Sequence, residues 1–288
     1  MQFVNRNDLI RWLDNIADIN AVGRGWSPDF WKPFHFVTLA ARARRESAGL
    51  KINNQQLDYA VRMGLFEAIG QTPPYSVFRR PANGRFVEAR TVQSEGEVAR
   101  VAQELSQMFR CENESSEEAL GVLFSELLGN CISHSTAGES EPFGLICGQT
   151  WPNGNKAQFC LADTGIGIRE SLMENSNLAE RLSNENACAV ATEYGVTGKP
   201  LGHHSGYGLA LTNDLVSKNN GRLFVVSGQE LYCNRGGDIQ VSELNNGWDG
   251  CAVIFEWQLD TNMDVEEVYN SWPAPDGMEE DDYDELFN

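Results

Sequence analysis

The sequence of 288 residues has no long hydrophobic run. No stretch approaches the ~18 consecutive apolar residues that a membrane-spanning helix needs. The first residues also lack the basic and then apolar pattern of a signal peptide. We therefore expect a soluble, cytoplasmic protein with no membrane partner.

Basic residues are scarce, because 22 Lys and Arg stand against 41 Asp and Glu and the formal net charge is −19. Affinity for nucleic acids comes mainly from Lys and Arg that neutralise phosphates, so this balance argues against a nucleic acid partner. Hydrophobic residues make up 41 % of the chain, which is enough for a packed core.

Paired cysteine motifs are also missing. The seven cysteines are scattered, odd in number and never spaced C-x-x-C. This pattern indicates neither a disulfide framework nor a zinc cluster. We expect most of them to be small buried side chains in a reducing compartment.

The length indicates about two domains, with one large domain as the alternative, and a polar stretch between Arg110 and Ala119 suggests the boundary. We expect an N-terminal regulatory unit over residues 1–110, either α/β or mainly helical, and a second domain over residues 115–259. Within the first unit, spacing and capping residues predict these elements: helices after Asn7, from Ser27 to Gly49 and from Leu57 to Gly70, a strand from Phe86 to Val92, and a helix from Ser94 to Phe109.

Residues 260–288 form an acidic tail with eleven Asp and Glu and no Lys or Arg. Such a segment repels itself and has little to bury, which predicts disorder. An acidic lure for a basic partner, with Tyr283, Leu286 and Phe287 as anchors, is the alternative.

The first motif that suggests chemistry lies on a predicted helix of about 20 residues, for which Ser115 and Glu118 form a capping box. Glu126, Asn130 and His134 are spaced i, i+4 and i+8, so they project from one side of that helix. A carboxylate and an amide one turn apart are able to share a water molecule and a metal ion. Taken alone, this pattern is also compatible with a solvated helix face.

A second motif follows a predicted strand that contains Phe159 and Leu161 and ends at Asp163, Gly165 and Gly167. Glycines lack a Cβ and tolerate positive φ, so the backbone can approach a planar ring closely. The Asp carboxylate can accept a hydrogen bond from an exocyclic amine.

The third motif, Gly206-Tyr-Gly208-Leu209, leads into a predicted helix that ends near Gly221. Glycines before a helix N-terminus form an anion site, because the N–H groups of the first turn are unpaired. Lys199, on the preceding loop, adds a positive charge.

These three motifs, in this order, resemble the ATP-binding domain shared by DNA gyrase, Hsp90, sensor histidine kinases and MutL, the GHKL or Bergerat-fold superfamily. Residues 126–134 resemble its N box, residues 163–167 its first glycine box and residues 206–209 its second. The resemblance covers residues 115 to 257. It implies an α+β sandwich in which helices cover one face of a mixed sheet, closed by strands near residues 225–228 and 250–255.

The resemblance also implies ligands and roles. ATP and Mg²⁺ would bind here, with Asn130 on the metal, Asp163 on the adenine amine, and Glu126 orienting and deprotonating a water molecule. His204 and Cys251 depart from the usual Gly and Thr of the family. The nucleotide-binding residues that it implies, including a lid from Thr197 to Gly208, are Asn130, Asp163, Gly165, Gly167, Thr197, Lys199, Ser205, Gly206, Gly208 and Leu209.

Residues 57–66 resemble the STAS-like segment fused ahead of such ATPases in prokaryotic proteins. This resemblance implies a regulatory protein partner. The alternative is a domain that only packs on the ATPase.

Our leading hypothesis from the sequence is a Mg²⁺-dependent ATPase that acts as a nucleotide-driven switch toward a protein partner. Two alternatives stay open. One is a protein serine/threonine kinase of the anti-sigma-factor type, and the other is a non-catalytic ATP-binding interaction protein of a toxin–antitoxin or phage-defence pair. A homodimer is compatible with each of them.

Overall fold

The computed structural model describes residues 3–22, 26–77, 82, 84–109, 114–134, 144–198 and 207–273. The α-helices are α1 (Arg6–Ile16), α2 (Pro33–Arg45), α3 (Asn54–Arg62), α4 (Leu65–Ala68), α5 (Glu95–Phe109), α6 (Glu114–His134), α7 (Ile168–Met173), α8 (Ala179–Asn184), α9 (Ala187–Val190), α10 (Gly208–Lys218) and α11 (Val265–Tyr269). The strands are β1 (Phe86–Val92), β2 (Gly144–Trp151), β3 (Lys156–Ala162), β4 (Arg222–Arg235) and β5 (Asp238–Gln258). None of the helices in these ranges is long and apolar enough to span a bilayer.

The strands form one sheet in the order β1-β2-β3-β5-β4. Every neighbouring pair of these strands is antiparallel, whereas the family resemblance had implied a mixed sheet. The connection between β1 and β2 explains the direction of its two strands. It contains two successive helices, α5 and α6, which run in opposite directions along the sheet, so the chain enters β2 antiparallel to β1. A connection with one crossover helix would instead make the two strands parallel.

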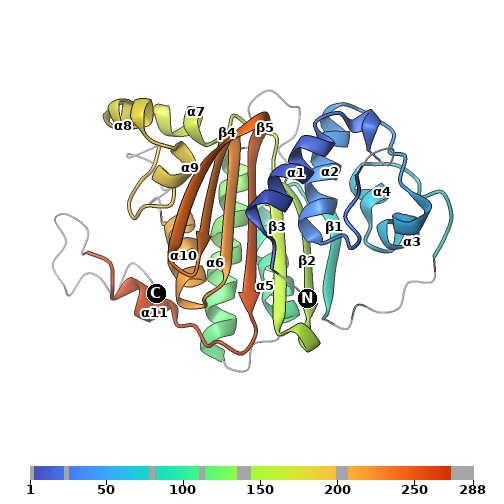
Figure 1. The fold of residues 1–288 in the computed structure, drawn as a ribbon. Coiled ribbons are helices and arrows are strands. Elements are labelled where there is room, and N and C mark those ends of the chain that lie inside the picture. The colour runs from blue at the N-terminus through green and yellow to red at the C-terminus, as the bar shows by residue number, and fades with distance from the viewer. Residues whose placement is uncertain are drawn as a thin grey trace.

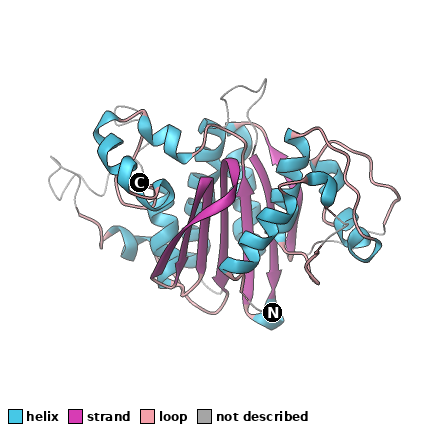
Figure 2. Ribbon diagram, turned by 45° about the horizontal axis from the view of Figure 1, so that its top comes forward, coloured by secondary structure: helices cyan, strands magenta, loops and turns pink. Residues whose placement is uncertain are grey.

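Helices cover both faces of the sheet (Figures 1 and 2): α6 and α10 of the predicted second domain lie on one face, as expected, and α1 and α2 of the N-terminal unit lie on the other. On one face α5, α6 and α10 pack on strand residues such as Phe159 and Phe255. On the other face α1 and α2 pack on their sequence neighbours Cys160 and Ile254. Successive residues of a strand point to opposite faces, so the central strands are buried on both sides and read as nearly continuous apolar runs.

The N-terminal unit is not separate from this sheet. Its described residues before β1 are helices and connecting segments, with no strand of their own. β1 pairs with β2, and α5 contributes Leu105 and Phe109 to the same core as α6. The division predicted at residues 110–115 therefore runs through one sheet and one hydrophobic core.

Local signals placed several helix ends incorrectly. Asn5, not Asn7, caps α1, because its Oδ1 accepts from the Asn7 N–H at 2.8 Å. The helix predicted from Ser27 begins at Pro33. The helix predicted from Leu57 to Gly70 is divided at Gly64, whose φ is +75° and whose added Cβ would lie 3.0 Å from the Ala89 oxygen on β1. Close packing against the sheet decides that break.

β4 turns back on itself at Gly228, where φ is +56°. The N–H of Gly236, just beyond the strand, donates to the Gly221 oxygen, just before it, at 3.1 Å. The second limb of β4 therefore returns beside the first, and residues 238–243 of β5 pair with this second limb.

The segment after β5 returns to the core. Ser116 Oγ on α6 accepts from the Met263 N–H at 2.9 Å, and Met263 and Val268 are both buried. The start of the acidic tail is thus ordered, contrary to the prediction for residues 260–288, and residues 274–288 lie outside the described residues.

Candidate functional site

A cavity of about 210 Å³ opens between α6, the end of β3, α7 and the start of α10. The structure brings most of the predicted site residues to it. Those that line it are Glu126, Asn130, Asp163, Gly167, Thr197, Gly208 and Leu209. Gly165 contacts Asp163 instead, and Lys199, Ser205 and Gly206 lie outside the described residues.

One wall of the cavity joins α6 to the N-terminus of α10. Glu126 and Asn130 are one helical turn apart on α6, and Glu126 is exposed. Gly208 begins α10 directly against them, since a Cβ added there would lie 2.8 Å from Asn130 Nδ2 and 3.1 Å from Glu126 Oε2. The unpaired N–H groups of a helix start, which favour anions, therefore face the same space as a carboxylate and an amide.

Asp163 lies just past the end of β3 and is 6 % exposed. Its Oδ1 accepts hydrogen bonds from the N–H of Gly165 at 2.8 Å and of Cys251 at 3.2 Å. Burial raises the pKa of Asp163 to about 6, although these hydrogen bonds oppose the rise. A buried carboxylate held by backbone donors is suited to accept a hydrogen bond from a ligand amine.

Two glycines allow neighbouring backbone segments to pack closely around Asp163. Gly250 has φ +84°, and an added Cβ would lie 2.4 Å from the Asp163 oxygen. Gly167 has φ +82°, and beside it Ser227 Oγ accepts from the Ile168 N–H at 2.8 Å and donates to the Gly250 oxygen at 2.7 Å. The glycine loop is therefore tied to β4 and β5.

Sequence reasoning did not assign the other residues that line the cavity, most of which are apolar or carry a thiol. These residues are Leu127, Cys131, Leu161, Ile168, Ser171, Leu172, Ala191, Val196, Gly198, Cys251 and Val253. The position of Cys131, directly after Asn130 on the same helix, was the sequence feature that could have predicted its place in the lining. Burial, and next the charge of Asp163, raise the pKa of Cys131 and Cys251 well above the ordinary thiol value. Both thiols are therefore neutral lining groups.

Comparison with known proteins agrees with this geometry. Residues 115–260 match the model of the histidine kinase-, DNA gyrase B- and HSP90-like ATPase family. The chain belongs to this family. A domain of this family implies that the chain binds ATP.

The chain is also similar to a curated relative, the circadian input-output histidine kinase CikA of Synechococcus elongatus. The two are 32 % identical over 108 residues, which is 38 % of this chain and 12 % of the relative. The match thus spans about an eighth of the length of that kinase.

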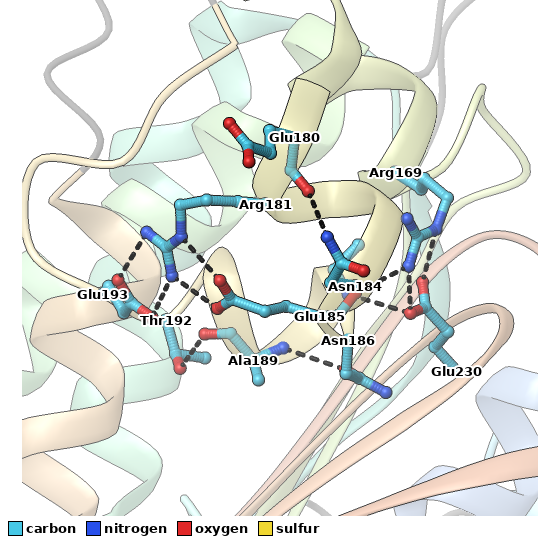
Figure 3. A network of polar contacts seen from close by, with 11 residues as sticks. Arg169, Glu180, Arg181, Asn184, Glu185, Asn186, Ala189, Thr192, Glu193 and Glu230 are labelled. Carbon is cyan, nitrogen blue, oxygen red and sulfur yellow. Dashed lines mark hydrogen bonds and ion pairs between the residues drawn. The ribbon is translucent and has the colours of Figure 1, made fainter. Parts of the chain in front are cut away.

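The segment between the two glycine boxes of the ATPase domain is held by two arginines (Figure 3). Arg169 on α7 pairs with Glu230 on β4, with Nη2 to Oε1 at 2.5 Å. Arg181 on α8 pairs with Glu185 at 2.7 Å and with Glu193 at 2.8 Å. These contacts position α8 and α9 ahead of residues 196–198, which line the cavity.

Aromatic rings hold the C-terminal segment beside the start of α10. Tyr194 and Tyr207 stack at 4.9 Å between ring centroids, and Trp272 lies 4.7 Å and 5.7 Å from them. Burial, with a contribution from the charge of Glu126, raises the pKa of Tyr269 on α11 to about 12. Tyr207 is the N-cap of α10, so this cluster braces the start of that helix.

Proposed function

We propose that the chain binds ATP together with Mg²⁺ in this cavity and hydrolyses the ATP. The convergence of Gly208, Glu126 and Asn130 is the observation that supports it most. Asp163 would receive the adenine amine at one end of the cavity, and the N-terminus of α10 would receive phosphate oxygens at the other.

The residues present fit Mg²⁺. Within the described ranges no group of three or more His, Cys, Asp and Glu could form an all-protein metal cage. Mg²⁺ usually takes one or two protein oxygens and completes its shell with phosphates and waters. The Asn130 side-chain oxygen is the ligand that we assign, and the ion would offset the charge of the phosphates in this acidic protein.

Glu126 would act as the general base. Its carboxylate is adjacent to Gly208, where the phosphates would bind, and it is exposed, so water reaches it. A base placed in this way orients a water molecule and accepts its proton during attack on the terminal phosphate. The same exposure would admit a hydroxyl group of a second protein, which is the observation in favour of protein kinase activity as the second candidate function.

We assign the partner-facing role to the N-terminal helices. The segments next to these helices expose large aromatic side chains, since Phe30 is 41 % and Tyr75 42 % exposed. The helices also share a core with Ala162 and Ala252, the sequence neighbours of Asp163 and Cys251. A rearrangement at the nucleotide would therefore reach the sheet face on which these helices pack.

The test is calorimetric titration of the full chain with ATP, with and without Mg²⁺, followed by measurement of phosphate release. We expect Mg²⁺-dependent binding and slow release of phosphate. Absence of binding would overturn the proposal. Binding without turnover would select the non-catalytic interaction protein, and transfer of labelled phosphate to a candidate partner would select the kinase.

A further inference from the structure

The outer limb of β5, residues 238–243, is an edge of the sheet. It pairs on one side with residues 230–235 of β4, and no strand among the described residues pairs with its other side. Ile239 and Val241 on this limb are 55 % and 50 % exposed. In an antiparallel edge strand, alternate residues direct their N–H and C=O groups away from the sheet. Such an edge is able to accept one more strand.

Arginines gather beside this limb on the face that α1 covers. Arg6, Arg222 and Arg235 line one cavity of about 450 Å³, together with Asp238 and Gln240 of the limb itself. Arg6 Nη1 donates to Gln240 Oε1 at 3.5 Å, and Arg222 and Arg235 are near enough for their charges to act on each other. Three cations around one cavity, in a chain with net charge −19, favour an anionic occupant.

The described part of the chain ends close to this edge. Trp272 Nε1 donates to Asp214 Oδ2 at 2.7 Å on α10. The adjacent Asn213 accepts from Tyr232 Oη at 2.7 Å, and Tyr232 pairs directly with Val241. One limb of β4 therefore separates the end of the C-terminal segment from the outer limb of β5.

The residues that follow Pro273 in the sequence carry acidic and apolar side chains, which complement the arginine cavity and the exposed Ile239 and Val241. Residues 274–288 contain seven Asp and Glu, no Lys or Arg, and the apolar side chains of Tyr283, Leu286 and Phe287. In an extended strand Asp282 and Asp284 point to one face and Tyr283 to the other. Residues 274–280 span up to about 25 Å when extended, which exceeds the width of a few strands at about 4.8 Å each.

We infer that residues 281–287 add to the outer limb of β5 as a further strand of the same chain. Asp282 and Asp284 then face the arginine cavity, and Tyr283 covers Ile239 and Val241. Backbone hydrogen bonds supply the affinity, and the alternation of acidic and aromatic side chains sets the register.

Amide hydrogen exchange of the full chain, followed by mass spectrometry, tests this inference. The comparison protein is a variant in which Asp281, Asp282 and Asp284 are changed to Asn and Glu285 to Gln. We expect residues 238–243 to exchange at least about tenfold more slowly in the parent chain. Residues 281–287 should also exchange more slowly than a free peptide of the same sequence. Arg235→Gln should reduce both effects, whereas Arg100→Gln, the same change on exposed α5, should leave both intact.

Free-peptide exchange rates over residues 281–287, with no change at residues 238–243 in the neutralised variant, would overturn the inference in favour of a solvating tail. Protection that disappears on dilution together with a dimer mass would also overturn it, because the strand would then come from a second copy. High salt should weaken the protection, since it screens the arginines.

Discussion

Asp163 and Cys251 hold each other through two hydrogen bonds. The Asp163 N–H donates to the Cys251 oxygen at 2.9 Å, and the Cys251 N–H donates to Asp163 Oδ1 at 3.2 Å. Both bonds use the backbone of residue 251. The departure from Thr at this position therefore leaves the placement of the Asp163 carboxylate unchanged.

Asp163→Asn should stabilise the free protein at neutral pH. The pKa of Asp163 in the folded protein is about 6, above its ordinary value of 3.8. Folding therefore favours the protonated form, and the ionised carboxylate costs about 3 kcal/mol of unfolding free energy above pH ~6. Asn removes this cost, so the gain should be largest near pH ~8 and vanish below pH ~4. Urea unfolding at several pH values measures it, and the exposed Asp260→Asn serves as the control.

The same carboxylate should make ATP binding sensitive to acid. If the ionised Asp163 accepts the adenine amine, the affinity for ATP should fall about tenfold per pH unit below pH ~6, and Asp163→Asn should lose most of it. Titration calorimetry from pH ~5 to ~8 gives both results. An affinity that is flat across this range would show that Asp163 does not touch the base.

Glu126→Gln should separate hydrolysis from binding. Removal of a general base typically costs about 10² to 10⁴ in rate, whereas the amide keeps the size of the side chain, so ATP affinity should stay within about threefold of the parent value. Glu118→Gln makes the same charge change two turns earlier on the exposed side of α6 and should leave phosphate release unchanged. Equal turnover in both variants would remove Glu126 from the proposed role.

Gly208→Ala should weaken nucleotide binding by crowding the polar wall. The added Cβ would lie 2.8 Å from Asn130 Nδ2, and overpacking of this kind costs about 1–3 kcal/mol. We expect roughly a tenfold loss of ATP affinity. Gly129→Ala on α6 meets nothing within 4 Å and should stabilise its helix by up to about 1 kcal/mol. An affinity for ATP in Gly208→Ala equal to that in Gly129→Ala would contradict the close approach.

Trp272→Ala should loosen the start of α10. The ring packs on Tyr194, Tyr207 and Tyr269, and its indole N–H bonds Asp214. We expect about 2 kcal/mol lower stability and weaker ATP binding. Trp272→Phe keeps an aromatic ring and loses the hydrogen bond, so it should cost about 1 kcal/mol. Thermal unfolding with and without ATP distinguishes the two variants, and an unchanged response to ATP in Trp272→Ala would exclude bracing of the site.

The sequence alone predicted several elements and seven of the residues that line the cavity. Residues 86–92 form the expected strand, and the helix with Glu126 and Asn130 has the expected length of about 20 residues. These predictions succeeded because they rest on local periodicity and on residue types at short spacing, which one helix or strand turns directly into geometry. Asp163 and Gly208 then meet Asn130 in one cavity, as the order of the three motifs indicated.

Only the tertiary structure decided against which element each buried face packs. Periodicity shows that α2 and β1 have buried faces, but not that α2 covers the far side of the sheet or that β1 joins β2. Likewise, the acidic composition of the tail predicted disorder, although Met263 and Trp272 in it contact α6 and α10. Local signals specify which side chains leave water, whereas the partner that covers them is chosen by packing between segments far apart in the chain.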